Sequence, residues 1–207
     1  MDFLPAGIEE TGDVPGNPGT PGNPMTIMMV LAPGDFNDDE YSICREVFDA
    51  AASGGIATGL VPGTSLDVRV CGLKKGLVRG SFGLWVDVEL ALFEVDLRSC
   101  AAVVFIGGSG VSACLNSRFI LKLARAAVDA GCVVGALCAA PGILARAGLL
   151  SMRPATAHPV AADELAMGGA VIVDSPVVVS ERIVTAAGPF AAREFAERIV
   201  AMARLGR

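Results

Sequence analysis

The chain has 207 residues, of which 53% are hydrophobic and 18% charged, proportions that suit one compact domain with a large core. The formal net charge of -6 and the absence of a sizeable Lys/Arg cluster argue against nucleic-acid binding. Uncharged stretches are too short, and too often broken by Gly and Pro, for a membrane span. We expect no signal peptide, because no basic region precedes an apolar one at the N-terminus.

The chain contains six cysteines and a single histidine. No two cysteines form a CxxC pair, and no histidine lies near them in sequence, so the pattern argues against a zinc site. Reduced thiols and a cytoplasmic location are expected for a chain of this size without a signal peptide. The cysteines are Cys44, Cys71, Cys100, Cys114, Cys132 and Cys138.

Residues 1–24 differ in composition from the rest of the chain. The segment 15–24 is a low-complexity run of Pro, Gly, Asn and Thr, which cannot build a core. Two interpretations stay open: a flexible extension, or a translation start at Met25 or Met28. The sequence therefore predicts a tail at 1–24 and a single domain at 25–207.

The domain is predicted to begin with an apolar strand at 25–31. Asn37 has the chemistry of a helix N-cap, and Asp38, Asp39 and Glu40 fall in the first helical turn, where the helix dipole favours acids. One interpretation is that all three acids only cap the helix. The alternative is that one of them faces a ligand at the carboxyl ends of the strands, where open α/β sheets bind ligands.

The segment after this first helix is irregular. Residues 51–64 are Gly-rich and ambiguous, 66–73 predict a second strand, and 74–81 predict a turn. Alternation over 84–90 predicts a third strand within a hairpin-like excursion.

A buried strand is predicted at 101–106, and it ends in the glycine-rich run Gly107-Gly108-Ser109-Gly110. The run lacks the Lys-Ser/Thr pair of a P-loop and the spacing of a dinucleotide fingerprint. We expect instead that its backbone N–H groups point at a ligand.

Cys138 stands where an apolar strand, 132–137, meets an Ala/Leu-rich helix at 139–147. A sharp turn there exposes the side chain at the carboxyl edge of the sheet, as in a nucleophile elbow with Cys in place of Ser. The helix N-terminus is expected to lower the pKa of the thiol. The alternative for this segment alone is a packed cysteine at a strand end.

His158, the only histidine, lies in a loop about 20 residues after Cys138. It is either a surface residue or a group that reaches the same sheet edge one βα unit later. The remaining pattern predicts helices at 118–130, 161–167 and 190–205 and short strands at 170–173, 177–179 and 183–185.

Strands that alternate with helices predict an α/β fold with a doubly wound, mostly parallel sheet. Strand-end loops then deliver Glu40, the N–H groups of Gly107 and Gly108, Cys138 and His158 to one edge. This convergence favours a reactive Cys138 over a packed one.

Five segments resemble the ThiJ/PfpI family, also called the parkinsonism-associated deglycase family, within the class I glutamine amidotransferase-like superfamily. They are DFNDDE at 35–40, FIGGSG at 105–110, GALCAAPGILA at 135–145, TAHPVAADELAMGGA at 156–170 and VTAAGPFAAREFA at 184–196. The resemblance implies a flavodoxin-like fold, a homodimer or higher oligomer, and no metal or organic cofactor.

Residue by residue, the resemblance implies that Cys138 is the reactive cysteine and that Glu40 touches its sulfur. Gly108 and Ala139 match the positions whose N–H groups form an oxyanion-type pocket. His158 matches the histidine of the deglycase branch. In the deglycase branch the histidine pairs with an acid from the partner subunit, and Glu46 stands at that position.

Other positions depart from the family pattern. Ala139 replaces the histidine that directly follows the cysteine in the protease-like branch, and the late His-x-Glu pair of glutamine amidotransferases is missing. Phe82 and Ala187 replace arginines that bind anionic groups, which argues against a negatively charged substrate.

Three functions follow from these residues. The first is a cysteine-dependent enzyme for small reactive carbonyls or their adducts, of glyoxalase or deglycase type, in which Glu40 shuttles a proton and His158 assists. A protonated Glu40, with its pKa raised by burial, would favour the thiolate. The second is a redox-sensing, stress-protective chaperone whose Cys138 is oxidised. The third and weakest is a peptidase or amidase.

Overall fold

The computed structural model describes residues 24–54 and 65–205. Within these ranges a seven-stranded sheet has the order β10-β11-β7-β6-β1-β2-β5, and every neighbouring pair is parallel except β10 and β11. The expected α/β class with a mostly parallel sheet is thus confirmed. The strands are β1 (Met25–Val30), β2 (Leu66–Gly72), β5 (Leu90–Ala91), β6 (Cys100–Phe105), β7 (Val133–Leu137), β10 (Val177–Ser180) and β11 (Ile183–Ala186).

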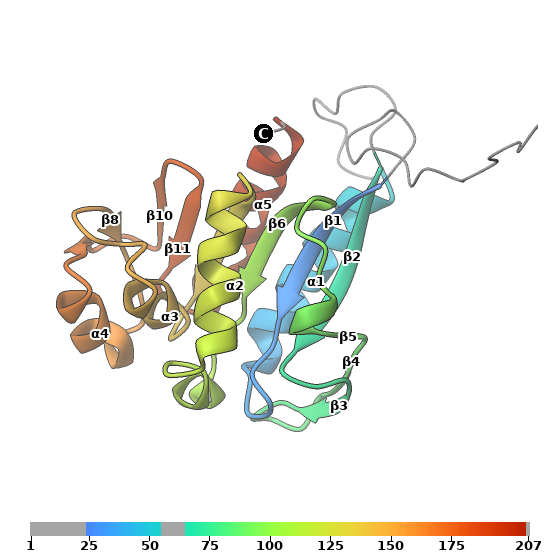
Figure 1. Cartoon of the computed structure of the whole chain (residues 1–207), viewed down its shortest axis with the longest axis horizontal. Helices are drawn as coiled ribbons and strands as arrows, with labels where there is room; N and C mark the ends of the chain where they lie inside the picture. The colour runs from blue at the N-terminus through green and yellow to red at the C-terminus, as the bar shows by residue number, and fades with distance from the viewer. Residues whose placement is uncertain (1–23, 55–64, 206–207) are drawn as a thin grey trace, which may run out of the picture.

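Helices cover both faces of this sheet (Figure 1). One core lies between the sheet and α1 and α5, and a second core lies between the opposite face and α2 and α3. This is the doubly wound arrangement. The helices are α1 (Asp38–Ala52), α2 (Arg118–Asp129), α3 (Pro141–Arg146), α4 (Ala162–Met167) and α5 (Ala192–Arg204). None of them, within the described ranges, has both the length and the apolar character that a membrane span requires.

The apolar character of β1 follows from burial on both sides. Ile27 and Met29 point into the core under α1 and α5, whereas Met28 and Val30 point into the core under α2. Successive side chains of a strand face opposite ways, so a strand between two helical layers is apolar at every position.

The hairpin of β3 (Gly76–Arg79) and β4 (Trp85–Val88) corrects two predictions. The predicted turn at 74–81 is wrong, because half of that segment is β3. The predicted strand at 84–90 divides into β4, which pairs with β3, and β5, which joins the central sheet beside β2. Most of β3 is exposed, so no apolar pattern marks it as a strand.

Smaller corrections concern element ends. α3 begins at Pro141 rather than 139, and α5 begins at Ala192 after a 3-10 turn over Pro189–Ala191. The strand predicted at 170–173 is β9 (Val171–Ile172), which pairs with β8 (Pro154–Ala155) outside the central sheet. The tail predicted at 1–24, apart from residue 24, and residues 55–64 of the ambiguous segment lie outside the described residues.

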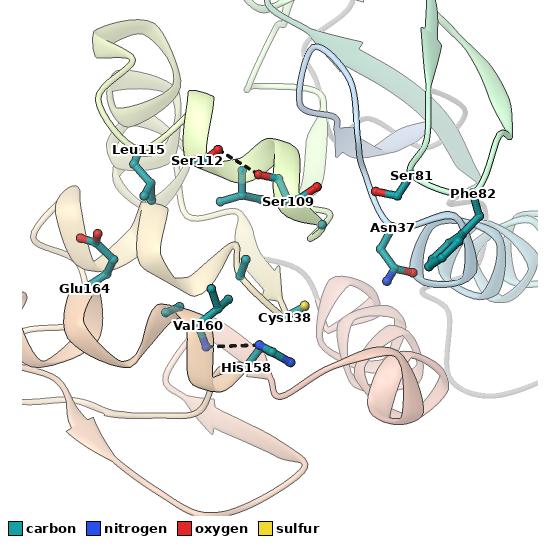
Figure 2. A pocket seen from close by; sticks show the side chains of 14 residues that line it. Asn37, Ser81, Phe82, Ser109, Ser112, Leu115, Cys138, His158, Val160 and Glu164 are labelled. Atoms are coloured by element: carbon teal, nitrogen blue, oxygen red, sulfur yellow. Dashed lines mark hydrogen bonds between the residues drawn. The ribbon is translucent and has the colours of Figure 1, made fainter.

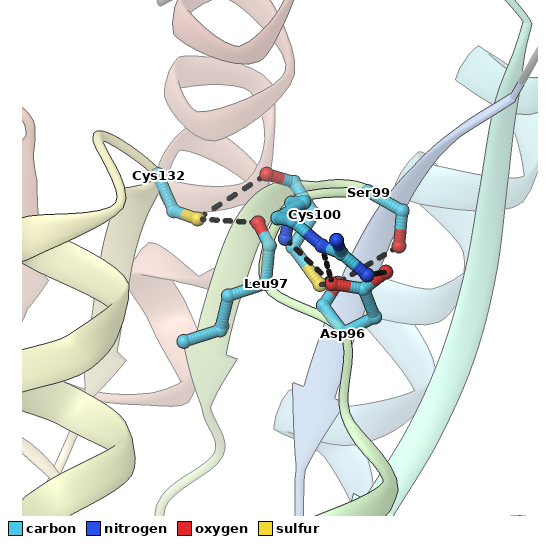
Figure 3. A network of polar contacts seen from close by, with 6 residues as sticks. Asp96, Leu97, Ser99, Cys100 and Cys132 are labelled. Atoms are coloured by element: carbon cyan, nitrogen blue, oxygen red, sulfur yellow. Dashed lines mark hydrogen bonds and ion pairs between the residues drawn. The ribbon is translucent and has the colours of Figure 1, made fainter. Parts of the chain in front are cut away.

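Two cysteines stabilise the edge of the sheet that lies away from Cys138 (Figure 3). The Cys132 thiol, just before β7, donates to the carbonyl oxygens of Cys100 at 3.2 Å and Leu97 at 3.7 Å. The Cys100 thiol in turn donates to the Asp96 carbonyl at 3.4 Å. These thiols therefore hold the chain where it enters β6 and β7.

The register of the sheet explains why distant segments meet. Val30, Phe105, Ala136 and Thr185 form one row across β1, β6, β7 and β11. Parallel strands that end at the same level bring their following loops together at one edge.

We predict that Gly110→Ala lowers the free energy of unfolding by at least about 2 kcal/mol, because overpacking against backbone forces a shift. A Cβ at Gly110 would lie 1.9 Å from the Gly34 carbonyl oxygen, in the loop that precedes Asn37. Urea unfolding followed by circular dichroism measures the change.

Gly34→Ala is the matched control in the same contact. Its added Cβ would lie 3.8 Å from the nearest heavy atom, the Arg79 carbonyl oxygen, an ordinary contact. Equal destabilisation by the two substitutions would contradict the prediction.

Candidate active site

Cys138 lies on a strained turn between β7 and α3. Its φ angle is 61°, and it is the one buried residue among the four described non-glycine residues with positive φ. The turn is held on both sides, since the Cys138 N–H donates to the Ala186 carbonyl at 2.8 Å and its carbonyl accepts from the His158 N–H at 2.9 Å. Strain held in place by its surroundings is typical of functional residues, and the geometry is that of a nucleophile elbow.

Glu40 lies in the first turn of α1 and is fully buried. The Asn37 side chain caps the helix by accepting from the Glu40 N–H at 3.0 Å. One carboxyl oxygen, Oε2, accepts from the Gly107 N–H at 3.0 Å. The other oxygen, Oε1, is buried and has no hydrogen-bond partner. The Cys138 thiol is nevertheless close enough to affect the pKa of the carboxyl.

Gly107 lies between the side chains of Glu40 and Cys138. A Cβ at this position would lie 2.5 Å from Glu40 Oε2 and 2.6 Å from Cys138 Cβ. Only glycine therefore allows the carboxyl and the thiol to approach each other. Its N–H serves the carboxyl, so Gly107 positions Glu40 rather than facing the sulfur.

Two other backbone N–H groups face the sulfur. Those of Gly108 and Ala139 hydrogen-bond to the Cys138 side chain and act to lower the pKa of its thiol. Gly108 has φ 115°, and a Cβ there would lie 2.5 Å from the Asn37 nitrogen, so this position also requires glycine. Both N–H groups expected to form an oxyanion-type pocket thus lie beside the sulfur.

His158 is exposed and lies near Cys138 in the same pocket (Figure 2). Its Nδ1 accepts from the Val160 N–H at 3.2 Å. A neutral imidazole in this arrangement carries its hydrogen on Nε2. The histidine is therefore available at the pocket as a donor through Nε2.

Glu46 and Ala187 lie outside the lining of this pocket. Glu46 is exposed on α1 and forms an ion pair of 3.0 Å with Arg193 of the same chain. Phe82, by contrast, lines the pocket. The pairing of His158 with a partner subunit's acid stays a prediction.

The pocket has a volume of about 430 Å³ and includes residues that the sequence did not single out (Figure 2). Ser81, Val111, Ser112 and Leu115 lie outside the five segments that resemble the family, whereas the others lie within these segments but their side chains were given no contact with a ligand. Within residues 24–54 and 65–205, no group of three or more His, Cys, Asp and Glu side chains is placed to hold a metal ion. The additional lining residues are Asn37, Ser81, Ser109, Val111, Ser112, Leu115, Val160, Ala161 and Glu164.

The ionisation of Cys138 differs from the expectation. Burial and the charge of Glu40 raise the pKa of the Cys138 thiol to about 12, more than the Gly108 and Ala139 N–H groups lower it. The predicted lowering is wrong because α3 is only 6 residues long and burial outweighs its dipole. The pKa of Glu40 rises to about 7, mainly through burial, as predicted.

The two groups titrate as a pair. With pKa values of about 7 for Glu40 and about 12 for Cys138, the pair loses one proton near neutral pH and keeps the other. The order of these pKa values places the remaining proton on the sulfur, next to the Glu40 carboxylate. When it lies on Glu40, the sulfur is a thiolate that accepts from the N–H groups of Gly108 and Ala139.

We predict that iodoacetamide alkylates Cys138 with a rate that rises through a step near pH 7, the pKa of Glu40. Below this pH both groups are protonated; above it the Glu40 carboxylate can take the thiol proton and so promote attack by the sulfur. Peptide mass spectrometry measures the rate, and Glu40→Gln should abolish the step because the group that titrates there is gone. Alkylation of the wild type that begins only above pH 9, the ordinary pKa of a thiol, would contradict proton transfer from Cys138 to Glu40.

Comparisons with known proteins identify the family. The model of the DJ-1/PfpI family matches residues 25–202. A glutathione-independent glyoxalase of Caenorhabditis elegans is 33% identical over 173 residues, which cover 84% of this chain and 86% of that protein. A deglycase of Pyrococcus abyssi is 31% identical over 123 residues, which cover 59% of this chain and 74% of that protein.

Solved structures show the same fold. A ThiJ/PfpI domain protein from Brachyspira murdochii superimposes with a TM-score of 0.77 at 27% identity, covering 87% of this chain and 97% of that one. The family matched by sequence is the one that the five motifs resemble. The chain belongs to the DJ-1/PfpI family.

Proposed function

We propose that the protein converts 2-oxoaldehydes such as methylglyoxal into 2-hydroxy acids, with Cys138 as the nucleophile and no cofactor. The observation that carries the proposal is a buried thiol that faces two backbone N–H groups and lies beside a buried carboxyl of pKa about 7. The glyoxalase and deglycase names of the relatives from Caenorhabditis elegans and Pyrococcus abyssi support it.

The reaction begins when the Cys138 thiolate adds to the aldehyde carbon. The aldehyde oxygen becomes an oxyanion, next to the N–H groups of Gly108 and Ala139, and takes a proton to give a hemithioacetal. A proton then moves from the first carbon to the second. The first carbon is thereby oxidised to a thioester and the neighbouring ketone is reduced to an alcohol, so no external oxidant or reductant is needed.

Water then hydrolyses the thioester, which releases the 2-hydroxy acid and restores the thiol. Glu40 is the proposed proton carrier, because its carboxyl lies beside the Cys138 thiol and its pKa of about 7 suits both uptake and release. His158 is proposed to assist through Nε2. The same attack on early adducts of the aldehyde with amines or thiols would give deglycation.

A redox-sensing or chaperone function is the alternative. The N–H groups that face the sulfur, and the unpaired Glu40 Oε1, would also hold the oxygens of an oxidised cysteine. Burial of Cys138 to 8% exposure restricts access of an oxidant to the sulfur. Intact-mass measurement after mild peroxide tests the alternative, which requires selective gain of oxygen on Cys138.

Peptidase or amidase activity is the weakest reading of the site, since Ala139 supplies no imidazole beside the nucleophile. Cleavage of a generic peptide substrate that depends on Cys138 would support this function.

The homodimer implied by the resemblance also stays a prediction, which light scattering tests.

We predict that the wild type forms lactate from methylglyoxal and that Cys138→Ser and Glu40→Gln each lower kcat/KM by at least about 100-fold, because one removes the thiolate and the other the proton carrier. His158→Ala should cost less, since Glu40 remains. Enzymatic assay of lactate gives the rates. Lactate formation by Cys138→Ser at the wild-type rate would contradict the proposed function.

A further inference from the structure

The pocket beside Cys138 is much larger than the three-carbon substrate methylglyoxal requires. Its volume of about 430 Å³ falls in the range of about 300–1,000 Å³ that accommodates drug-sized ligands. The apolar wall is formed by Leu115 and Val160, which lie on one side of the pocket (Figure 2). Val111 and Ala161 add further apolar lining. Phe82 lies on the opposite side, beyond Asn37, with Cys138 and His158 between the two (Figure 2).

The pocket carries no net charge that would bind an anion. Among the described residues that line it, Glu164 is the single Asp or Glu and there is no Lys or Arg. Both Glu164 oxygens accept from Arg146, at 2.6 and 3.0 Å, and this pairing holds the pKa of Glu164 below its usual value. The Glu164 carboxylate is thus ionised, and the Arg146 guanidinium balances its charge.

The backbone at Phe82 is held in place, although the residue is 78% exposed. Its N–H donates to Asp38 Oδ2 at 3.0 Å, and the Leu84 N–H donates to Asp38 Oδ1 at 2.7 Å. A Cβ at Gly80 would lie 2.2 Å from Asp38 Oδ2, so the carboxylate occupies the space that a side chain there would need. Asp38 thus ties the loop that carries Phe82 to the helical turn that carries Glu40.

We infer that this pocket selects uncharged 2-oxoaldehydes whose substituent is apolar and larger than methyl. The inference rests on the proposed function. The aldehyde carbon lies at Cys138, and the substituent extends between Phe82 and the wall around Leu115. A carboxylate or phosphate at the far end of the substituent would lose its hydration without gaining a cation.

Three 2-oxoaldehydes test the inference: methylglyoxal, 2-oxopentanal and 4,5-dioxopentanoate. The last two share a five-carbon chain that ends in a methyl group or a carboxylate. We predict that kcat/KM for 2-oxopentanal exceeds that for methylglyoxal by about tenfold, as expected for burial of two further methylene groups. It should exceed that for 4,5-dioxopentanoate by at least about tenfold as well. Chromatography of the hydroxy acids gives the rates, with Cys138→Ser as background.

Variants at the pocket locate the selectivity. Phe82→Ala and Leu115→Ala should each reduce the ratio of 2-oxopentanal to methylglyoxal at least about threefold, and Phe82→Arg should raise kcat/KM for 4,5-dioxopentanoate about tenfold. Phe93 is the matched control, because it is 87% exposed and lies outside the pocket. Phe93→Ala and Phe93→Arg should leave all three values unchanged.

The outcomes separate this inference from the proposed function. Conversion of methylglyoxal without any advantage for 2-oxopentanal overturns the inference alone. Equal use of 2-oxopentanal and 4,5-dioxopentanoate does the same. If no hydroxy acid forms from any of the three aldehydes above the Cys138→Ser background, the proposed function fails and the selectivity with it.

Discussion

The close approach of Glu40 and Cys138 around Gly107 is the constraint on which the site depends. A carboxyl that is fully buried is costly to ionise, and a thiol beside it is costly to ionise for the same reason and through repulsion. The pair therefore keeps one proton over a wide range of pH, from about 7 to about 12. The absence of a side chain at Gly107 permits the contact, and its N–H fixes the carboxyl by hydrogen bonding to Oε2.

Each partner in this contact is fixed by a different part of the fold. Glu40 is held by the Asn37 cap at the start of α1. Cys138 is held by hydrogen bonds to Ala186 and His158 on either side of the strained turn. Because β1, β6, β7 and β11 end at the same level, neither group needs to move to meet the other. Such a prearranged site can stabilise developing charge without first reorganising.

The hairpin of β3 and β4 adds the substrate side of the pocket to this chemical centre. The Asp38 carboxylate accepts hydrogen bonds from two N–H groups of the loop that carries Phe82. Glu40 follows Asp38 two residues later on the same helical turn. A helix start that looks like a simple cluster of capping acids thus has three functions. Asn37 caps, Asp38 orients the hairpin, and Glu40 enters the site.

Local pattern was enough to place β1, β6 and β7, because strands buried on both faces are apolar throughout. It was also enough to bring Glu40, Gly108, Cys138 and His158 to one edge, since parallel strands direct their following loops to the same side. Four of the five segments that resemble the family lie at the ends of β1, β6, β7 and β11, where the site residues are.

Tertiary structure alone decided the rest. The residue pattern left open which acid of the first turn faces the thiol, and only the family resemblance named Glu40. The hairpin-like excursion was expected, but its partner strand β3 was missed because most of its residues are exposed. The pKa of Cys138 was mispredicted because a short local segment shows the helix N-terminus but not the burial and the carboxyl that outweigh it. The sequence thus determined that Glu40 and Cys138 meet, whereas desolvation in the folded chain determined the pKa values of the two groups.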